Sequence, residues 1–444
     1  MISLIVSVSL AAVPITLEEA RQQSRSNPLV LQVELDRLRG LEQERMARSA
    51  LLPQVSLTAS PAIARAGPSR AQVVVPVQNA ETGELTTQQR VLQSPAVTRT
   101  SLDLTLNLNQ LIYDAGRWAR LSQAGYELES LVGQAQQETM ASEFEGIRRF
   151  YAVHRAQRTL EVYQARVKED EALLKRATDL VEAGKRSRSD IQSALVNLGN
   201  DRIQSILEQG QVTVAGSDLA MWLGRDGTEV LSAVPPQVLE QPLKPLPTWE
   251  SVLATARESH PLLKVFRAQL RSAEANISVA RSGYLPRVGA TVTYNRASPT
   301  TDPFFTDLSQ QNTLGANVLL SWNLYNGSQT QAQVRDAELL RDKTKVNFIQ
   351  YEKELHGEVF KAYVVLQAQM AASEVAEINL QQAREGLRIA LDLYSAGALP
   401  TLEVRDAQLK LTNAELTWLE SRIDVEIAWA ALEFNMGTLG KGAP

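Results

Sequence analysis

The sequence predicts an α+β protein in which one unit occurs twice in tandem, each copy holding two β-strands and a long antiparallel helical hairpin. Three observations predict this fold. Matching segments recur in the same order in both halves, a period of two gives way to a helical period in each half, and proline-free helical stretches span 117–182 and 329–395. An aromatic content of 5% in 444 residues fits long exposed helices better than a thick globular core.

The composition excludes several kinds of site. The chain contains no cysteine, which rules out disulfides, thiolate metal sites and a lipid-modified N-terminal cysteine. A formal net charge of −5 argues against a nucleic-acid partner. The three histidines are scattered without metal-ligand spacing, and neither a nucleophile elbow nor a phosphate-binding loop is present. We therefore expect neither an enzyme nor a metal or cofactor site.

Residues 1–13 are similar to the apolar part of a secretory signal peptide, with small residues at Ala11 and Ala12. They lack the positively charged leader of such a signal. Two alternatives are a short buried strand and a start site assigned too far downstream. No apolar run reaches the length of about 18 residues that a transmembrane helix needs, so no such helix is predicted.

The tandem copies are visible as paired segments. ALLPQVSLTAS (50–60) corresponds to GYLPRVGATVT (283–293), LNLNQLIYDAG (106–116) to VLLSWNLYNGS (318–328), and LAMWLG (219–224) to LEFNMG (432–437). These pairs place the first copy at 14–233 and the second at 249–440, joined by a proline-rich linker at 234–248. Each copy opens with helical segments.

Four segments alternate apolar and polar residues, as β-strands with two different faces do. They are 54–64, 98–113, 287–295 and 313–325, and the segments 65–97 and 296–312 that connect them are predicted to be polar, irregular loops. The alternation fits a half-buried sheet with a solvent face, and it also fits a membrane barrel with an apolar lipid face and a polar lumen. Four strands cannot close a barrel, and open edges are not tolerated in lipid, so a barrel requires strands from several subunits.

Each copy continues with a long helix, 117–182 or 329–395, which extends roughly 100 Å at about 1.5 Å per residue. That length requires packing of the coiled-coil type, and apolar residues at 3–4 spacing support it. A glycine ends each long helix and a second helix follows, so each copy forms an antiparallel hairpin. The predicted tips are 183–188 and 396–400, and the predicted return helices are 188–223 and 401–436.

The order of these motifs resembles the outer membrane efflux protein family, the TolC-like channel-tunnels. The matching residues are an LPxV segment before the first strand of each copy, a turn motif after the second strand, and Tyr-Ser-Ala-Gly at the second tip: 52–55, 285–288, 113–116, 325–328 and 394–397. The resemblance implies a homotrimer whose protomers each contribute four strands to a 12-stranded outer membrane β-barrel. Below it, the long coiled-coil helices form a tunnel of roughly 100 Å. The implied location is the outer membrane of a Gram-negative bacterium, with a large periplasmic part.

The same resemblance implies the exit duct of a tripartite efflux pump or a type I secretion system, gated at its periplasmic tip. The implied partners are a periplasmic adaptor (membrane fusion) protein, an inner-membrane transporter and outer membrane lipid. The alternative is a periplasmic coiled-coil adaptor or scaffold protein of a transport complex, which would need one hairpin flanked by compact β-domains. Drugs, metals, siderophores and secreted proteins all remain open as cargo.

Glu403 and Asp406 are three residues apart on one helix face and align with the acidic constriction of the family. In a trimer they would form two stacked carboxylate rings that favour cations. The alternative is that acids in the first turn of a helix, marked by Pro400, stabilise its dipole. The tip residues expected to contact the adaptor are Gly184, Lys185, Gly397, Ala398 and Leu399.

Asp190 aligns with a family acid that latches the closed tip by bonding to a tyrosine and an arginine of the other hairpin. Tyr394 is the matching tyrosine, but Leu399 stands at the position of the arginine. Basic residues occur on the first tip instead, so we expect a latch of Asp190, Tyr394 and Arg186, with Arg405 beside the acidic rings. The alternative for Ser187 and Asp190 is a helix-capping pair.

Overall fold

The computed structural model describes residues 12–78, 83, 85–184, 187–298, 312–396 and 398–440. The chain divides into two compact units. The first, the helical unit, comprises Met1–Glu42, Gly125–Ser272 and Arg341–Pro444. The second, the sheet unit, comprises Gln43–Ala124 and Ala273–Leu340. No helix in the described ranges is long and apolar enough to cross a membrane.

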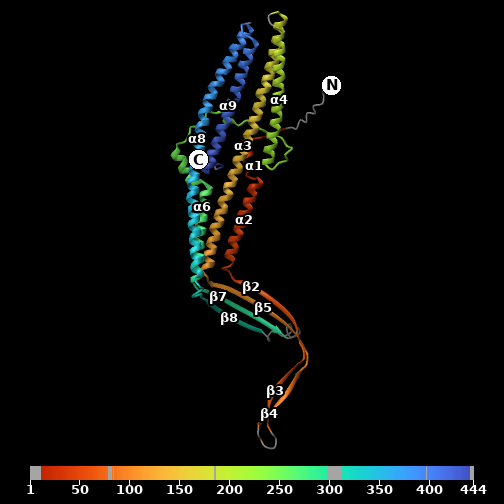
Figure 1. The fold of residues 1–444 in the computed structure, drawn as a ribbon, viewed down its shortest axis with the longest axis vertical. Helices are drawn as coiled ribbons and strands as arrows, with labels where there is room; N and C mark the ends of the chain where they lie inside the picture. The colour runs from red at the N-terminus through yellow and green to blue at the C-terminus, as the bar shows by residue number, and fades with distance from the viewer. Residues whose placement is uncertain are drawn as a thin grey trace. The chain divides into compact units, whose positions relative to one another are not determined.

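The tandem duplication is confirmed by the order of the elements (Figure 1). The first copy contains α1 (Leu17–Ser24), α2 (Pro28–Ser49), β2 (Gln54–Ala66), β5 (Val97–Tyr113), α3 (Ala115–Glu182) and α4 (Arg188–Trp222). The second copy contains α5 (Trp249–Ser259), α6 (Pro261–Arg281), β7 (Arg287–Ser298), β8 (Asn312–Ser321), α8 (Gln329–Ser395) and α9 (Thr401–Met436). A short 3₁₀ turn, η2 (Ser282–Tyr284), follows α6.

The two longest helices are continuous: α3 has 68 residues and α8 has 67. α3 begins two residues before the predicted start because Asp114 caps it. The Oδ1 atom of Asp114 accepts hydrogen bonds from the backbone N–H groups of Gly116 at 2.8 Å and Arg117 at 3.2 Å. Each long helix forms a hairpin with its return helix, α3 with α4 and α8 with α9 (Figure 1).

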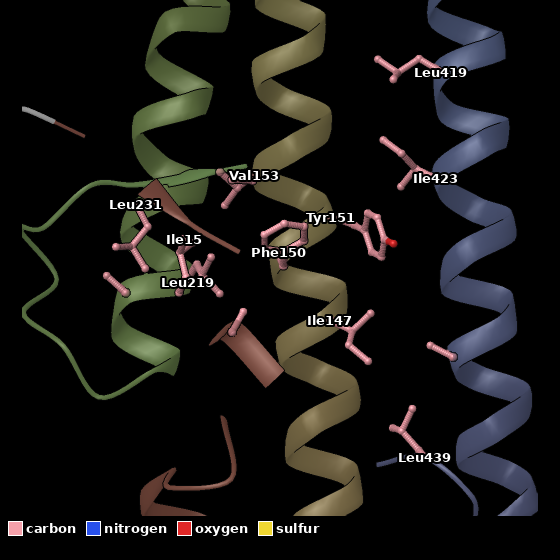
Figure 2. Packing of buried hydrophobic residues seen from close by; sticks show 14 residues of the cluster. Ile15, Ile147, Phe150, Tyr151, Val153, Leu219, Leu231, Leu419, Ile423 and Leu439 are labelled. Carbon is pink, nitrogen blue, oxygen red and sulfur yellow. The ribbon is translucent and has the colours of Figure 1, made fainter. Parts of the chain in front are cut away.

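The main core of the helical unit surrounds the middle of α3 (Figure 2). Ile147 and Tyr151 extend toward α9, where they meet Leu419 and Ile423, while Val153 extends toward α4. Because α3 contributes to both sides, it joins the two hairpins in this core. Each fully buried apolar side chain of this kind stabilises the fold by about 1.5–3 kcal/mol.

A short parallel pair connects the two ends of the first copy. β1 (Val13–Ile15) pairs with β6 (Leu231–Ala233), and Ile15 belongs to the main core. Of these three strand residues only Ile15 is buried, while Val13 and Pro14 are exposed, and residues 1–11 lie outside the described part of the chain.

The proline-rich linker crosses α8 and α9 and contains one 3₁₀ turn, η1 (Gln237–Glu240). Arg422 of α9 donates to the backbone oxygens of Leu239 at 2.9 Å and Gln241 at 2.7 Å. Tyr363 of α8 donates to the oxygen of Pro247 at 3.2 Å. These bonds satisfy backbone groups of a segment that has no regular pairing of its own.

The sheet unit contains an antiparallel four-stranded sheet in the order β2-β5-β7-β8. The second copy therefore places its strands directly beside those of the first. β8 ends at Ser321, earlier than the predicted 325, because Ser321 pairs with Arg287, the first residue of β7, and no partner continues beyond it. Among the described residues, neither β2 nor β8 has a strand on its outer side.

The segment between the first two long strands departs from the expectation. The sequence predicts a polar, irregular loop at 65–97, but the structure has β3 (Ser69–Gln78) and β4 (Leu85–Ser94) paired antiparallel. The β-branched run Val73–Val74–Val75 favours extended backbone. The polar residues around it led to the prediction of a loop instead of a strand. Of the other predicted loop, 296–312, residues 299–311 lie outside the described part.

Candidate functional site

The first hairpin tip closes between Glu182, the last residue of α3, and Arg188, the first of α4. Gly184 has φ +73°, a left-handed conformation that only glycine adopts without strain, and its N–H donates to the oxygen of Val181 at 3.0 Å. Ser187 caps α4 by accepting from the N–H of Ser189 at 3.3 Å. Lys185 and Arg186 lie outside the described residues.

The second tip closes between Ser395 and Thr401. The N–H of Ala398 donates to the oxygen of Leu393 at 2.9 Å, a bond five residues back of the kind that closes a Schellman turn. Pro400 precedes α9 in extended conformation, with φ −74° and ψ 156°, and therefore occupies the N-cap position. Gly397 lies outside the described residues.

An apolar cluster, the tip cluster, joins the second tip to the first hairpin. Its buried members are Leu173 of α3, Leu387 and Tyr394 of α8, and Val404 of α9. Leu399 packs against this cluster. Leu399, at the position expected to hold the latch arginine, thus makes an apolar contact. An arginine side chain at this position could not keep that contact while it reached a carboxylate.

Of the three expected latch residues the structure describes Tyr394 and Asp190, while Arg186 lies outside the described residues. Tyr394 is fully buried in the tip cluster, while Asp190 is half-buried in the first turn of α4. Ser187 caps this helix, but its hydroxyl accepts from Ser189 rather than from the residue three positions on. Ser187 therefore caps α4 without the expected i, i+3 pairing with Asp190, and Asp190 adds a negative charge to the helix N-terminus.

Glu403 and Asp406 are both exposed on α9, one turn apart. Asp406 Oδ2 lies 2.7 Å from Nζ of Lys410, four residues on. This hydrogen bond, helped by the charges of Asp406 and Glu403, raises the pKa of Lys410. A cation, Lys410, therefore lies beside the acids of the candidate rings. It was not predicted from the sequence, although the i, i+4 spacing of Asp406 and Lys410 indicates such a pair.

A buried group of four charges, the charge tetrad, links both hairpins beside the tip cluster. It consists of Arg166 and Asp170 of α3, Asp201 of α4 and Arg405 of α9. The exposed fractions of their side chains are 8%, 2%, 7% and 14% in that order. Arg405 was expected beside the acidic rings; the structure turns it inward instead.

Arg405 makes most of the contacts in the tetrad. Its Nη1 donates to Asp170 Oδ2 at 3.3 Å and to Asp201 Oδ2 at 3.0 Å, and its Nη2 donates to Asp201 Oδ1 at 3.2 Å. Nη2 of Arg166 lies 2.9 Å from Asp201 Oδ2, an ion-pair distance without hydrogen-bond geometry. When both carboxyls are ionised, the two negative charges balance the two arginines and the tetrad is neutral. Buried charges are tolerated when they are paired in this way.

The two carboxyls of the tetrad differ in proton affinity. Burial, the hydrogen bond with Asp201 and the charge of Asp201 raise the pKa of Asp170 to about 6, against the opposing charges of Arg405 and Arg166. Burial also acts against ionisation of Asp201, but hydrogen bonds from Arg405 and Asp170 and the charges of both arginines outweigh it and lower its pKa. Asp170 is thus the carboxyl that takes up a proton first.

The four-stranded sheet has two chemically different faces. Paired residues of one face are polar, and three hydrogen bonds link β5 to β7 across it: Thr291 to Asn109 at 2.9 Å, Thr293 to Asn107 at 2.8 Å, and Asn295 to Thr105 at 3.0 Å. The opposite face carries exposed apolar side chains. Its most exposed members are Val55, Leu57, Ile63, Leu314 and Val318.

The described residues hold no group of three or more His, Asp or Glu side chains suited to a metal ion. His154 and His260 are buried, and burial lowers the pKa of each to about 4. Both are therefore neutral at physiological pH and serve in packing.

Comparisons with known proteins agree on one family and one fold. A family model described as outer membrane efflux protein matches residues 17–225 and 252–438. The outer membrane protein TolC of Vibrio cholerae is 23% identical over 431 residues, 96% of this chain and 91% of that protein. The outer membrane efflux protein BepC of Brucella suis is 22% identical over 179 residues, and the match spans 40% of this chain and 39% of BepC.

Among solved structures, CusC superposes with a TM-score of 0.77 at 16% identity, covering 95% of this chain and 92% of CusC. This likeness identifies the fold as that of a channel-tunnel.

Proposed function

The chain belongs to the outer membrane efflux protein family and resides in the outer membrane, and from this premise we propose that three copies assemble into the exit duct of a tripartite efflux pump or type I secretion system. The duct is passive: cargo moves through it, and the energy comes from a transporter in the inner membrane. Its periplasmic end is gated by the hairpin tips. A periplasmic adaptor protein contacts those tips around Gly184, Lys185, Gly397, Ala398 and Leu399.

The observation that carries the proposal concerns the four-stranded sheet: among the described residues its outer strands β2 and β8 have no further strand beside them, and one of its faces is exposed and apolar. An unpaired edge in lipid leaves backbone N–H and C=O groups without partners, at a cost of several kcal/mol each. Pairing β8 of one copy with β2 of the next removes both edges, and three copies supply twelve strands. The apolar face then meets lipid, and the Asn and Thr ladder between β5 and β7 lines the lumen.

Exposed aromatic residues support the membrane placement. Tyr113 ends β5, and Trp322 and Tyr325 follow β8, all at the strand ends that lead into α3 and α8. The indole N–H of Trp322 donates to the oxygen of Tyr284 at 3.0 Å, which holds its ring in place. Tyr and Trp concentrate at membrane–water interfaces, so these residues mark the periplasmic boundary of the barrel.

The helical unit offers a matching pair of surfaces for a ring of three copies. α4 exposes one apolar stripe and α8 another, consisting of Val196, Ile203, Leu207 and Val214 on α4 and of Phe360, Val364, Val375 and Ile378 on α8. Contact between α4 of one copy and α8 of the next is head-to-tail, the type of interface that closes into a ring. The spacing of both stripes suits coiled-coil packing.

The gate at the tip combines three features. Glu403 and Asp406 form acidic rings, and Lys410 adds a basic ring one turn beyond, which reduces their net charge. Asp190, Tyr394 and Arg186 form the latch between tips. The tip cluster around Leu399 holds the second tip against the first hairpin inside each copy.

Membrane fractionation followed by SDS-PAGE of unheated samples tests the assembly, and planar-bilayer conductance tests the duct. We expect an outer membrane protein that migrates as a trimer until heated and that conducts ions. A protein that stays soluble, or that remains monomeric after mild detergent extraction, would instead be the periplasmic adaptor or scaffold.

A further inference from the structure

The charge tetrad has a property that a plain salt bridge lacks: two of its four members are carboxyls that share the same guanidinium. Nη1 of Arg405 lies 3.3 Å from Asp170 Oδ2 and 3.0 Å from Asp201 Oδ2. Two ionised carboxylates held this close repel each other, and burial of Asp170 at 2% exposure limits the screening by water. A single proton on Asp170 removes the repulsion and supplies a donor for Asp201.

We propose that Asp170 and Asp201 form a proton-dependent lock between the two helical hairpins, strengthened when Asp170 is protonated and weakened when it is ionised. The lock joins α3 and α4 of the first hairpin to α9 of the second within one copy. The charged groups that act on Asp170 are Arg166 from α3, Asp201 from α4 and Arg405 from α9. The adjacent pair of Glu171 and Arg202, 2.7 Å apart, is exposed and lies outside the tetrad.

The direction of the pH effect follows from linkage. The pKa of Asp170 is raised to about 6 in the packed structure, against 3.8 for an unperturbed aspartate. A raised pKa means that the packed form binds the proton more tightly than the released form, so packing is favoured at low pH and loses that contribution as pH rises through about 6. With these two values, lowering the pH from about 7.5 to about 5 favours the locked form about tenfold.

The consequence for the duct rests on the proposed function: a periplasm acidified below about pH 6 holds the tips more firmly closed. The lock itself does not depend on conduction, because all four tetrad residues belong to one copy. The lock can therefore be measured even if the protein does not conduct ions. Conduction can likewise be measured even if hydrogen exchange does not depend on pH.

Hydrogen–deuterium exchange of the full chain in detergent, corrected for the intrinsic pH dependence of amide exchange, tests the lock. The reporters are backbone amides of α4 and α9 around Asp201 and Arg405. In the wild-type chain we expect their opening constant to fall about tenfold between about pH 7.5 and about pH 5. Asp170→Asn keeps the shape and the donor of the protonated acid, so it should exchange at pH 7.5 as slowly as the wild type does at pH 5.

The matched control is Glu171→Gln, which removes the neighbouring exposed acid on the same helix and should leave the pH dependence intact. If Asp170→Asn retains the wild-type pH dependence, or if the wild-type opening constant does not change with pH, the proposal is overturned. The wild-type pH profile is decisive by itself should the Asn variant fold poorly.

Discussion

Arg405 is the residue whose removal should most weaken the packing of the second hairpin against the first. In Arg405→Ala, three charge-assisted hydrogen bonds to Asp170 and Asp201 are lost. Both carboxyls remain in a site where their side chains are 2% and 7% exposed, so water replaces the guanidinium poorly. The perturbation is therefore larger than the loss of the bonds alone, because it leaves buried charge without compensation.

The magnitude follows from the burial of the ion pairs. Removing one partner of a buried pair costs about 3–5 kcal/mol. Arg166 still contacts Asp201 at 2.9 Å, which places the expected loss at the lower end, about 3 kcal/mol. That corresponds to a local opening constant roughly 100-fold larger.

The assay is native-state hydrogen exchange at about pH 7.5, where Asp170 is largely ionised. Arg202→Ala is the control. Arg202 pairs with Glu171 between α4 and α3, the helices that carry Asp201 and Asp170, but its side chain is 56% exposed. That variant should be indistinguishable from wild type. Equal exchange in Arg405→Ala and Arg202→Ala would show that Arg405 does not hold the two hairpins together. Additive losses in Arg405→Ala and Asp201→Ala would contradict a shared network, since residues in one network should couple by about 0.5–3 kcal/mol.

Three further predictions concern the gate and the core. Replacing both Glu403 and Asp406 with Ala should lower cation selectivity or block by multivalent cations in bilayer recordings, whereas Lys410→Gln should raise the cation selectivity. Unchanged selectivity in both variants would mean that these residues do not line the pore. Asp190→Ala should increase the open conductance by weakening the latch, and an unchanged conductance would mean that the tip is held elsewhere. Phe150→Ala, which empties a fully buried site in the main core, should cost about 3–5 kcal/mol of stability, read as a lower midpoint of thermal dissociation and unfolding.

The repeating architecture could be predicted because it depends on local patterns. The alternation in 98–113 and the proline-free 3–4 spacing of 329–395 reflect side-chain periods that the backbone geometry of strand and helix imposes, whatever the neighbours. The glycine that ends α3 is similarly local, since the conformation of Gly184 is disfavoured for other residues. These signals identify where elements begin, turn and end.

The charge tetrad and the inward position of Arg405 were decided only by the tertiary structure. Arg405 is 204 residues from Asp201 and 235 from Asp170, and no local pattern relates positions so far apart. Arg405 was expected beside the acidic rings, yet its side chain contacts Asp170 of α3 and Asp201 of α4 because the hairpins pack side by side. Leu399 joins the tip cluster for the same reason. A sequence thus determines which faces its helices have, while the partner that each face meets depends on packing, which is a property of the whole chain.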